Sequence, residues 1–162
     1  MTTCDCFKSG AVRRLVSKAK FDAIRELIRK SPAFRKVENL EKLEEAVVQR
    51  EQIQSTACGH GIAFAHAKTD QVSNIVVVLG VSRTGIDFGT PDGNPVNLLF
   101  IIASPLDTPL EYLMTLSALA RIFYDGCFTK EDLKSLTLPG IGAKLIAQLK
   151  NAFDVARLEV CQ

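Results

Sequence analysis

Both histidines of the chain, His60 and His66, lie in one short segment, GHGIAFAHAK. A neutral imidazole nitrogen is a nucleophile toward phosphorus, and it is also a common metal ligand. Small residues flank His66 and leave its ring approachable, while glycines flank His60 and allow backbone N–H groups to come near an anion. These small residues are Gly59, Gly61, Ala65 and Ala67. The pattern favours a phosphoryl acceptor at His66.

Arg50 precedes this segment at the end of a predicted helix. A nucleophile that takes up a phosphoryl group needs cations or hydrogen-bond donors around the phosphoryl oxygens. A guanidinium presents several N–H donors in one plane and suits such oxygens. We therefore expect Arg50 to reach back toward the histidine segment.

Other uses of the histidines stay open at this point. A straight strand would separate His60 from His66 by roughly 20 Å, so that only a bend at Gly61 lets them share a proton or a metal. A zinc site from Cys58, His60 and His66 lacks the paired ligand spacing of structural zinc sites. Packing of both rings in the core is the remaining alternative.

Helical periodicity comes first along the chain. Apolar residues recur at helical spacing over residues 11–31, and Pro32 ends that pattern. Asn39 is a suitable N-cap for a second helix over residues 40–54. Arg50 would then lie in the last turn of this second helix.

The period changes to that of strands in the histidine segment. Residues 60–66 alternate, which predicts His60, Ile62, Phe64 and His66 on one face of a strand. The apolar runs NIVVVLGVS and VNLLFIIAS are typical of central strands covered on both faces. The residues TPDGNP before the second run indicate a turn.

Helical patterns return after Thr108. We expect helices over residues 108–126 and 142–157, and between them a helix capped by Thr129 with Asp132 three residues later. A sheet with two apolar faces needs helices on both, so the order of elements predicts an α/β fold, a three-layer α/β/α sandwich. We expect residues 1–10 to be a flexible N-terminus and residues 11–162 to form a single domain.

Composition limits the classes of function. The chain has 20 Lys and Arg against 18 Asp and Glu, a net charge of +2, which does not indicate a nucleic-acid partner. The segment TLPGIGAKLIAQLK resembles the phosphate-gripping hairpin of helix-hairpin-helix DNA-binding modules, or it is a plain helix start. Five cysteines, no apolar leader and no run of membrane-spanning length predict a cytoplasmic protein with free thiols and no membrane insertion.

Three segments, in this order, carry a resemblance to a known family. They are REQIQSTACGHGIAFAHAK, IDFGTPDGNPVNLLFIIASP and EYLMTLSALARIF. Together they resemble the enzyme IIA domains of the phosphoenolpyruvate-dependent phosphotransferase system (PTS), of the fructose, mannitol and nitrogen-regulatory type. The resemblance implies that residues 11–162 are one EIIA type-2 domain with a mixed central sheet. It also implies a short first strand within AVRRLVS, where periodicity predicts helix.

The resemblance implies roles for particular residues. His66 would accept a phosphoryl group from the phosphohistidine of a small carrier of the HPr or NPr kind, and Arg50 would bind that group. No metal, nucleotide or other cofactor is implied. The family's second histidine is replaced by Tyr112, whose neutral hydroxyl can still donate a hydrogen bond to a phosphoryl oxygen. His60 is a possible auxiliary partner.

The resemblance leaves three functions to distinguish. In the first, the chain is a regulatory phosphocarrier whose phosphorylation state is read by a target protein, which the absence of a fused IIB or membrane segment from these 162 residues favours. In the second, it passes the phosphoryl group to a separate IIB domain for sugar uptake. In the third, it is a binding module without phosphotransfer, because two residues of the family pattern are missing. Ala65 replaces the proline that usually precedes the active histidine and loosens the expected turn there, and Tyr112 replaces the second histidine.

Overall fold

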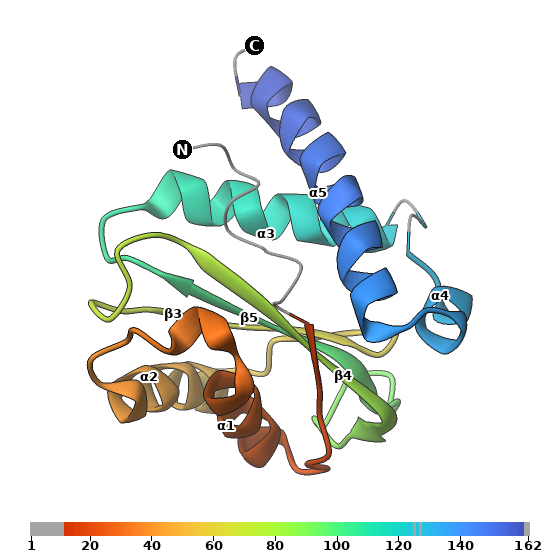
Figure 1. Ribbon diagram of the computed structural model, residues 1–162, viewed down its shortest axis with the longest axis horizontal. Coiled ribbons are helices and arrows are strands. Elements are labelled where there is room, and N and C mark those ends of the chain that lie inside the picture. Colours follow the sequence, from red (N-terminus) through yellow and green to blue (C-terminus); the bar gives the residue numbers. More distant parts are fainter. Residues whose placement is uncertain (1–11, 125, 127, 161–162) are drawn as a thin grey trace.

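The computed structural model describes residues 12–124, 126 and 128–160, with side chains up to Asn151. A five-stranded sheet lies between two layers of helices, with α1 and α2 on one face and α3 and α5 on the other (Figure 1). The predicted three-layer α/β/α sandwich is therefore confirmed. The flexible N-terminus expected for residues 1–10 lies outside the described residues. The helices are α1 (Lys20–Lys30), a 3-10 helix (Pro32–Phe34), α2 (Leu40–Ile53), α3 (Pro109–Tyr124), α4 (Lys130–Ser135) and α5 (Leu138–Val160).

The sheet is mixed, as the resemblance implied. Its strands lie in the order β1-β4-β5-β3-β2. β1 runs parallel to β4 and β3 runs parallel to β5, whereas β4 is antiparallel to β5 and β2 is antiparallel to β3. The strands are β1 (Val12–Arg14), β2 (Ala57–Gly59), β3 (Ile62–Lys68), β4 (Val76–Ile86) and β5 (Val96–Ser104).

The helix predicted over residues 11–31 is wrong in its first half. Val12–Arg14 form β1, with Val12 opposite Leu79 of β4, and α1 begins only at Lys20. Leu15 packs so closely on Gly80 that a Cβ added there would overlap the Leu15 side chain. Hydrogen bonding to β4 decides the structure of these residues in spite of their helical spacing. Periodicity in the sequence carries no information on such long-range hydrogen bonds. The short strand that the resemblance implied is confirmed.

Two predicted helix caps are confirmed. The Asn39 carboxamide oxygen accepts the Lys42 backbone N–H at 3.0 Å at the start of α2. Thr129 and Asp132 form reciprocal hydrogen bonds at the start of α4. Each cap satisfies N–H groups that have no partner inside the helix and typically stabilises it by about 1 kcal/mol.

The segment LPGIG forms the first turns of α5, which begins earlier than predicted. The Thr137 hydroxyl accepts the Gly140 N–H at 3.2 Å, and the Thr137 carbonyl accepts the Ile141 N–H at 2.9 Å. This segment is thus a helix start and not a hairpin. None of the helices within the described residues is both long and apolar enough to cross a membrane.

Aromatic rings join β3 and β5 to α3. Phe64 stacks on Phe100 with 5.3 Å between ring centroids, and Phe123 of α3 lies edge-on to both. Phe64 therefore faces the α3 layer. Because side chains alternate along a strand, His66 faces the same layer.

Candidate functional site

The second half of β3 is an open edge of the sheet. In the described residues β2 pairs only with Ile62 and Ala63, and the Thr56 carbonyl accepts the Phe64 N–H. No strand is paired with that side of β3 from Ala65 onward in the part of the chain that the structure describes. Residues of α2 and of α3, from the two opposite helix layers, therefore face one pocket across this edge.

A pocket of about 460 Å³ lies over the open edge. α2 supplies one wall, β3 supplies His66 and the two residues after it, and α3 supplies Tyr112. The lining residues are Ala46, Gln49, Arg50, Ile53, His66, Ala67, Lys68 and Tyr112. The structure therefore brings three of the predicted site residues, His66, Arg50 and Tyr112, to one pocket.

One hydrogen bond determines the chemistry of the half-buried His66 ring. Its Nδ1 lies 2.9 Å from the Phe64 carbonyl oxygen. A carbonyl only accepts hydrogen bonds, so Nδ1 carries the proton, and the lone pair of the neutral ring is on Nε2. Burial and the Arg50 charge lower the pKa of His66 from 6.5, against the opposing effects of the Phe64 carbonyl and Glu51. The ring is therefore neutral at pH 7, with a free lone pair.

Arg50 is held in place at the end of α2. Its Nη1 donates to the Gln54 carbonyl at 3.0 Å, which is the only hydrogen bond recorded for its side chain among the described residues. The positive charge acts on both His66 and Tyr112, since it lowers the pKa of each group. The guanidinium thus stands close to both rings and keeps N–H donors for a further acceptor.

Tyr112 lies beside His66 on the other wall of the pocket. The two ring centroids are 5.4 Å apart, and the rings are tilted by 47°. Burial raises the pKa of the Tyr112 hydroxyl above 10, although Arg50 acts against this shift. The hydroxyl therefore stays neutral and keeps its proton for donation.

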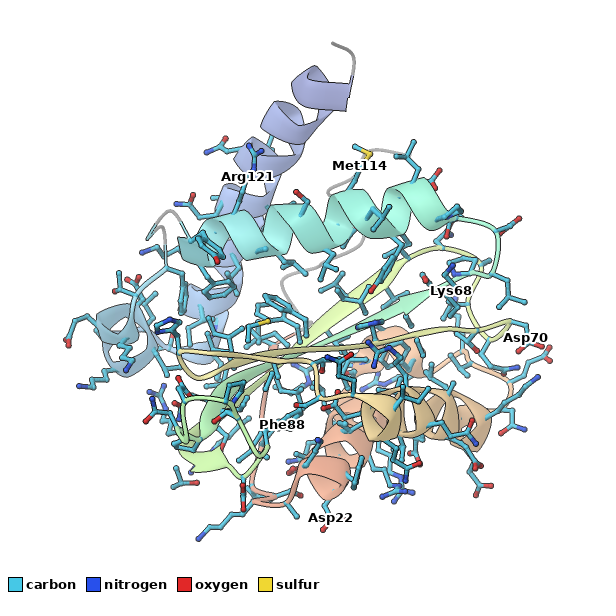
Figure 2. All side chains as sticks on the ribbon, turned by 180° about the vertical axis from the view of Figure 1, so that it is seen from behind. Asp22, Lys68, Asp70, Phe88, Met114 and Arg121 are labelled. Atoms are coloured by element: carbon cyan, nitrogen blue, oxygen red, sulfur yellow. The ribbon has the colours of Figure 1, made fainter. Side chains whose placement is uncertain are left out.

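Lys68 is a pocket residue that the sequence reasoning missed. It follows His66 by two positions on β3, so both side chains point to the same face. Figure 2 shows Lys68 at the end of the sheet, between the levels of α3 and α2. The alternation of the predicted strand was the available signal, because it places Lys68 on the same face as His66.

Glu51 is a second residue that was missed. Its side chain is buried, with 2% of the residue exposed. The carboxylate accepts the Thr56 N–H at 3.0 and 3.1 Å and the Thr56 hydroxyl, and it pairs with Lys20 at 3.1 Å. These contacts fasten the end of α2 to α1 and to the entry of β2. Glu51 thereby orients the helix turn that carries Arg50. The available signal in the sequence was its position directly after Arg50 in the segment REQIQSTACGHGIAFAHAK.

His60 is not part of this pocket. The strand predicted over residues 60–66 is wrong at its start, since His60 lies in the turn between β2 and β3 with a positive φ of 56°. Its backbone N–H donates to the Asp92 carboxylate at 2.9 Å, which holds the pKa of Asp92 well below its usual range. The anion at the glycine-flanked turn is thus a side chain of this protein.

The expected turn at Ala65 is also absent. Ala65 is fully buried inside β3, opposite Ile101 of β5. Flanking strand pairing keeps this residue extended without a proline. Cys58, His60 and His66 do not gather into a metal-binding cluster, and no such group of three or more ligands occurs in the described residues.

Comparison with known proteins gives a family match for most of the chain. The model of "Phosphoenolpyruvate-dependent sugar phosphotransferase system, EIIA 2" matches residues 6–136. The chain is 30% identical over 138 residues to the PTS fructose-specific EIIABC component of Bacillus subtilis, covering 85% of this chain and 21% of that protein. It is 30% identical over 113 residues to a nitrogen regulatory protein of Bradyrhizobium diazoefficiens, covering 70% of this chain and 73% of that protein.

The chain spans about a fifth of the B. subtilis relative and half of another relative, the fructose-specific EIIA component of Haloferax volcanii. Among solved structures it resembles the nitrogen regulatory protein IIA-Ntr of Neisseria meningitidis, with a TM-score of 0.76 and 25% identity over 88% of this chain and 97% of that one. The Escherichia coli complex of IIA mannitol with phosphorylated IIB mannitol shares the fold, with a TM-score of 0.67 and 20% identity over 87% of this chain and 97% of that one.

Proposed function

Because the chain belongs to the EIIA 2 family of the phosphoenolpyruvate-dependent sugar phosphotransferase system, we propose that it carries a phosphoryl group on His66. The donor is the phosphohistidine of an HPr- or NPr-type carrier protein. Residues 11–162 act in this proposal as one EIIA domain. The observation that carries it is the hydrogen bond from His66 Nδ1–H to the Phe64 carbonyl, which leaves the Nε2 lone pair free in a pocket shared with Arg50.

The transfer balances without a cofactor. The Nε2 lone pair of His66 forms the new N–P bond while the N–P bond of the donor breaks, and the donor nitrogen keeps that electron pair. The His66 ring retains its Nδ1 proton and becomes an imidazolium. Its hydrogen bond to the Phe64 carbonyl then becomes charge-assisted and stronger.

Arg50 and Tyr112 bind the phosphoryl oxygens in this proposal. Arg50 neutralises negative charge on the phosphoryl oxygens and donates hydrogen bonds to them from N–H groups that do not bind Gln54. The Tyr112 hydroxyl donates a further hydrogen bond to these oxygens. Both groups are in place before the donor arrives, so little reorganisation accompanies the transfer. His60 has no role here, because it lies in the β2–β3 turn.

We place the chain in the nitrogen-regulatory branch, where a target protein reads the phosphorylation state of His66. The similarity to nitrogen regulatory proteins supports this choice, since it extends over most of both chains. Sugar uptake, with transfer from His66 to a separate IIB domain, is the second candidate. The fructose-specific relatives favour that candidate.

The test is reconstitution with phosphoenolpyruvate, enzyme I and an HPr-type carrier. We expect one acid-labile phosphate per chain, lost in His66→Ala and kept in His60→Ala, which removes the other histidine. No labelling of the wild-type chain, while a known IIA acceptor is labelled in the same mixture, would leave only a binding module without phosphotransfer. Rapid loss of the phosphate on addition of a IIB domain and its sugar would favour uptake over regulation.

A further inference from the structure

The residues assigned so far bring few charged donors to the oxygens of the proposed phosphoryl group. A phosphoryl group at pH 7 carries between one and two negative charges. Tyr112 is neutral at this pH, because burial raises the pKa of its hydroxyl. The positive charge of the His66 imidazolium stays on the ring, so Arg50 is the only side chain assigned so far that brings a cation to the phosphoryl oxygens. A second cationic side chain at these oxygens would stabilise the dianion further.

Lys68 is positioned to supply that charge. It lines the same pocket as His66, Arg50 and Tyr112. On a strand, side chains two positions apart lie on one face about 7 Å from each other, which a four-carbon lysine side chain spans. The ammonium of Lys68 can therefore reach an oxygen of a phosphoryl group held on His66 Nε2.

Lys68 is also free to move to that position. Its side chain is exposed, and it forms no hydrogen bond or ion pair with another residue in the described part of the chain. Several other lysines are engaged: Lys20 pairs with Glu51, Lys42 with Asp70, and Lys144 with Asp132. Recruiting Lys68 therefore breaks no existing interaction.

We propose that Lys68 is a further phosphoryl-binding residue, which supplies a second cationic side chain, besides Arg50, to the oxygens of the phosphoryl group on His66. The proposal rests on the proposed function, since it concerns the same phosphohistidine. Lys68 stabilises the dianionic form of the group and lowers its protonation midpoint. A neutral tyrosine beside the acceptor is then compatible with a stable phosphohistidine, because the missing charge comes from β3 and not from α3.

The test uses chemically phosphorylated protein, so that it does not depend on any carrier. In a His60→Gln background, phosphoramidate transfers its phosphoryl group to His66 and releases ammonia. The pH dependence of the ³¹P chemical shift then gives the protonation midpoint of the phosphoryl group. The variants are Lys68→Gln, Lys68→Arg and the matched control Lys36→Gln, which removes an exposed lysine that does not line the pocket.

We expect the midpoint of Lys68→Gln to rise by about half a pH unit, since the attraction at an exposed site is screened by solvent. Lys68→Arg and Lys36→Gln should match the parent protein. With an HPr-type donor, Lys68→Gln should also accept the phosphoryl group about threefold more slowly, from the same loss of charge stabilisation.

An unchanged midpoint in Lys68→Gln would overturn the role of Lys68 and leave the proposed function intact. A raised midpoint in a protein that no carrier phosphorylates would support Lys68 and contradict the proposed function. A shift of equal size in Lys36→Gln would show a general charge effect and overturn the specific assignment. Failure of phosphoramidate to label His66 would contradict both.

Discussion

One histidine lies in the turn before β3 and the other lies near the end of β3, and the two surroundings are built in opposite ways. At the His60 end, two turns interlock: the Asp92 carboxylate accepts the His60 N–H, and the Gly61 carbonyl accepts the N–H groups of Asn97 and Leu98. At the His66 end, the strand edge is open, and a pocket separates α2 from α3. The same residue type therefore serves a backbone turn in one place and presents a free lone pair in the other.

This difference predicts that residues near the start of β3 affect the stability of the fold, whereas residues near its end affect the proposed phosphotransfer. The closed end has backbone groups that satisfy one another, so changes there act on folding. Within the described residues, the open end has side-chain donors without partners for all of their N–H and O–H groups, so changes there should alter the proposed phosphotransfer to His66. Substitutions at the two ends should have effects that hardly overlap.

The largest effect is expected at the open end. Arg50→Gln removes the guanidinium and should slow phosphorylation of His66 by about 100-fold or more, the usual loss for one preorganised transition-state donor. The free energy of unfolding should change by less than about 0.5 kcal/mol, since the one recorded hydrogen bond of the side chain is at the surface. Initial rates of phosphotransfer and urea unfolding measure the two quantities. A loss of several kcal/mol of stability would show that the two ends are not independent.

At the closed end, Gly61→Ala should destabilise the fold by about 1–3 kcal/mol. Gly61 has a φ of 79°, and an added Cβ would lie 3.1 Å from the Asn97 carboxamide oxygen. Gly93→Ala is the matched control, because its φ is 72° and no atom lies within 4 Å of an added Cβ. It should cost less, from backbone strain alone. Equal losses in urea unfolding would mean that the contact with Asn97 contributes nothing.

A smaller effect should follow from Tyr112→Phe. The ring and its packing on His66 remain, and only the hydroxyl donor is lost, so phosphotransfer should slow by about 3- to 10-fold. Tyr124→Phe provides the control, since Tyr124 belongs to the same helix and is 92% exposed. The initial rates at which the two variants are phosphorylated on His66 decide whether the Tyr112 hydroxyl takes part in phosphotransfer. An unchanged rate in Tyr112→Phe would reduce Tyr112 to a packing residue.

The smallest effect concerns pH. Burial lowers the pKa of His66, so the folded protein binds fewer protons there than the unfolded chain as pH falls through 6.5. The His66 contribution to stability is thus complete above 6.5 and is lost progressively down to the pKa of the folded state. Titration of the His66 ring by NMR should give a midpoint below 6.5. A midpoint above that value would contradict the burial and the influence of Arg50.

Much of the fold followed from local patterns in the sequence. The Asn39 cap and the Thr129–Asp132 pair depend on residues three positions apart, and both appear as predicted. The strands around VVVLGV and VNLLFIIAS carry enough apolar β-branched character to be recognised alone. β1 could not be recognised in this way, because its helical spacing competes with a pairing to Leu79 that lies far along the chain.

The candidate site divides in the same manner. His66 and Arg50 stood out by residue type and by the motif around them, whereas the contacts of Lys68 and Glu51 became visible in the fold. The glycines beside His60 suggested an anion-binding turn, and the anion proved to be Asp92 from another loop. A sequence motif identifies groups that can bind an anion but does not identify the anion.

The sequence by itself determined the three-layer architecture, the helix caps and the presence of one histidine, the proposed acceptor, with one arginine near it. Those features depend on periodicity and on neighbours within a few residues. Only the tertiary structure decided which ring nitrogen keeps its proton, which strand edge stays open, and which cations gather there. These depend on where the Phe64 carbonyl, α2 and α3 meet, and contacts between distant segments leave no periodic signal in the chain.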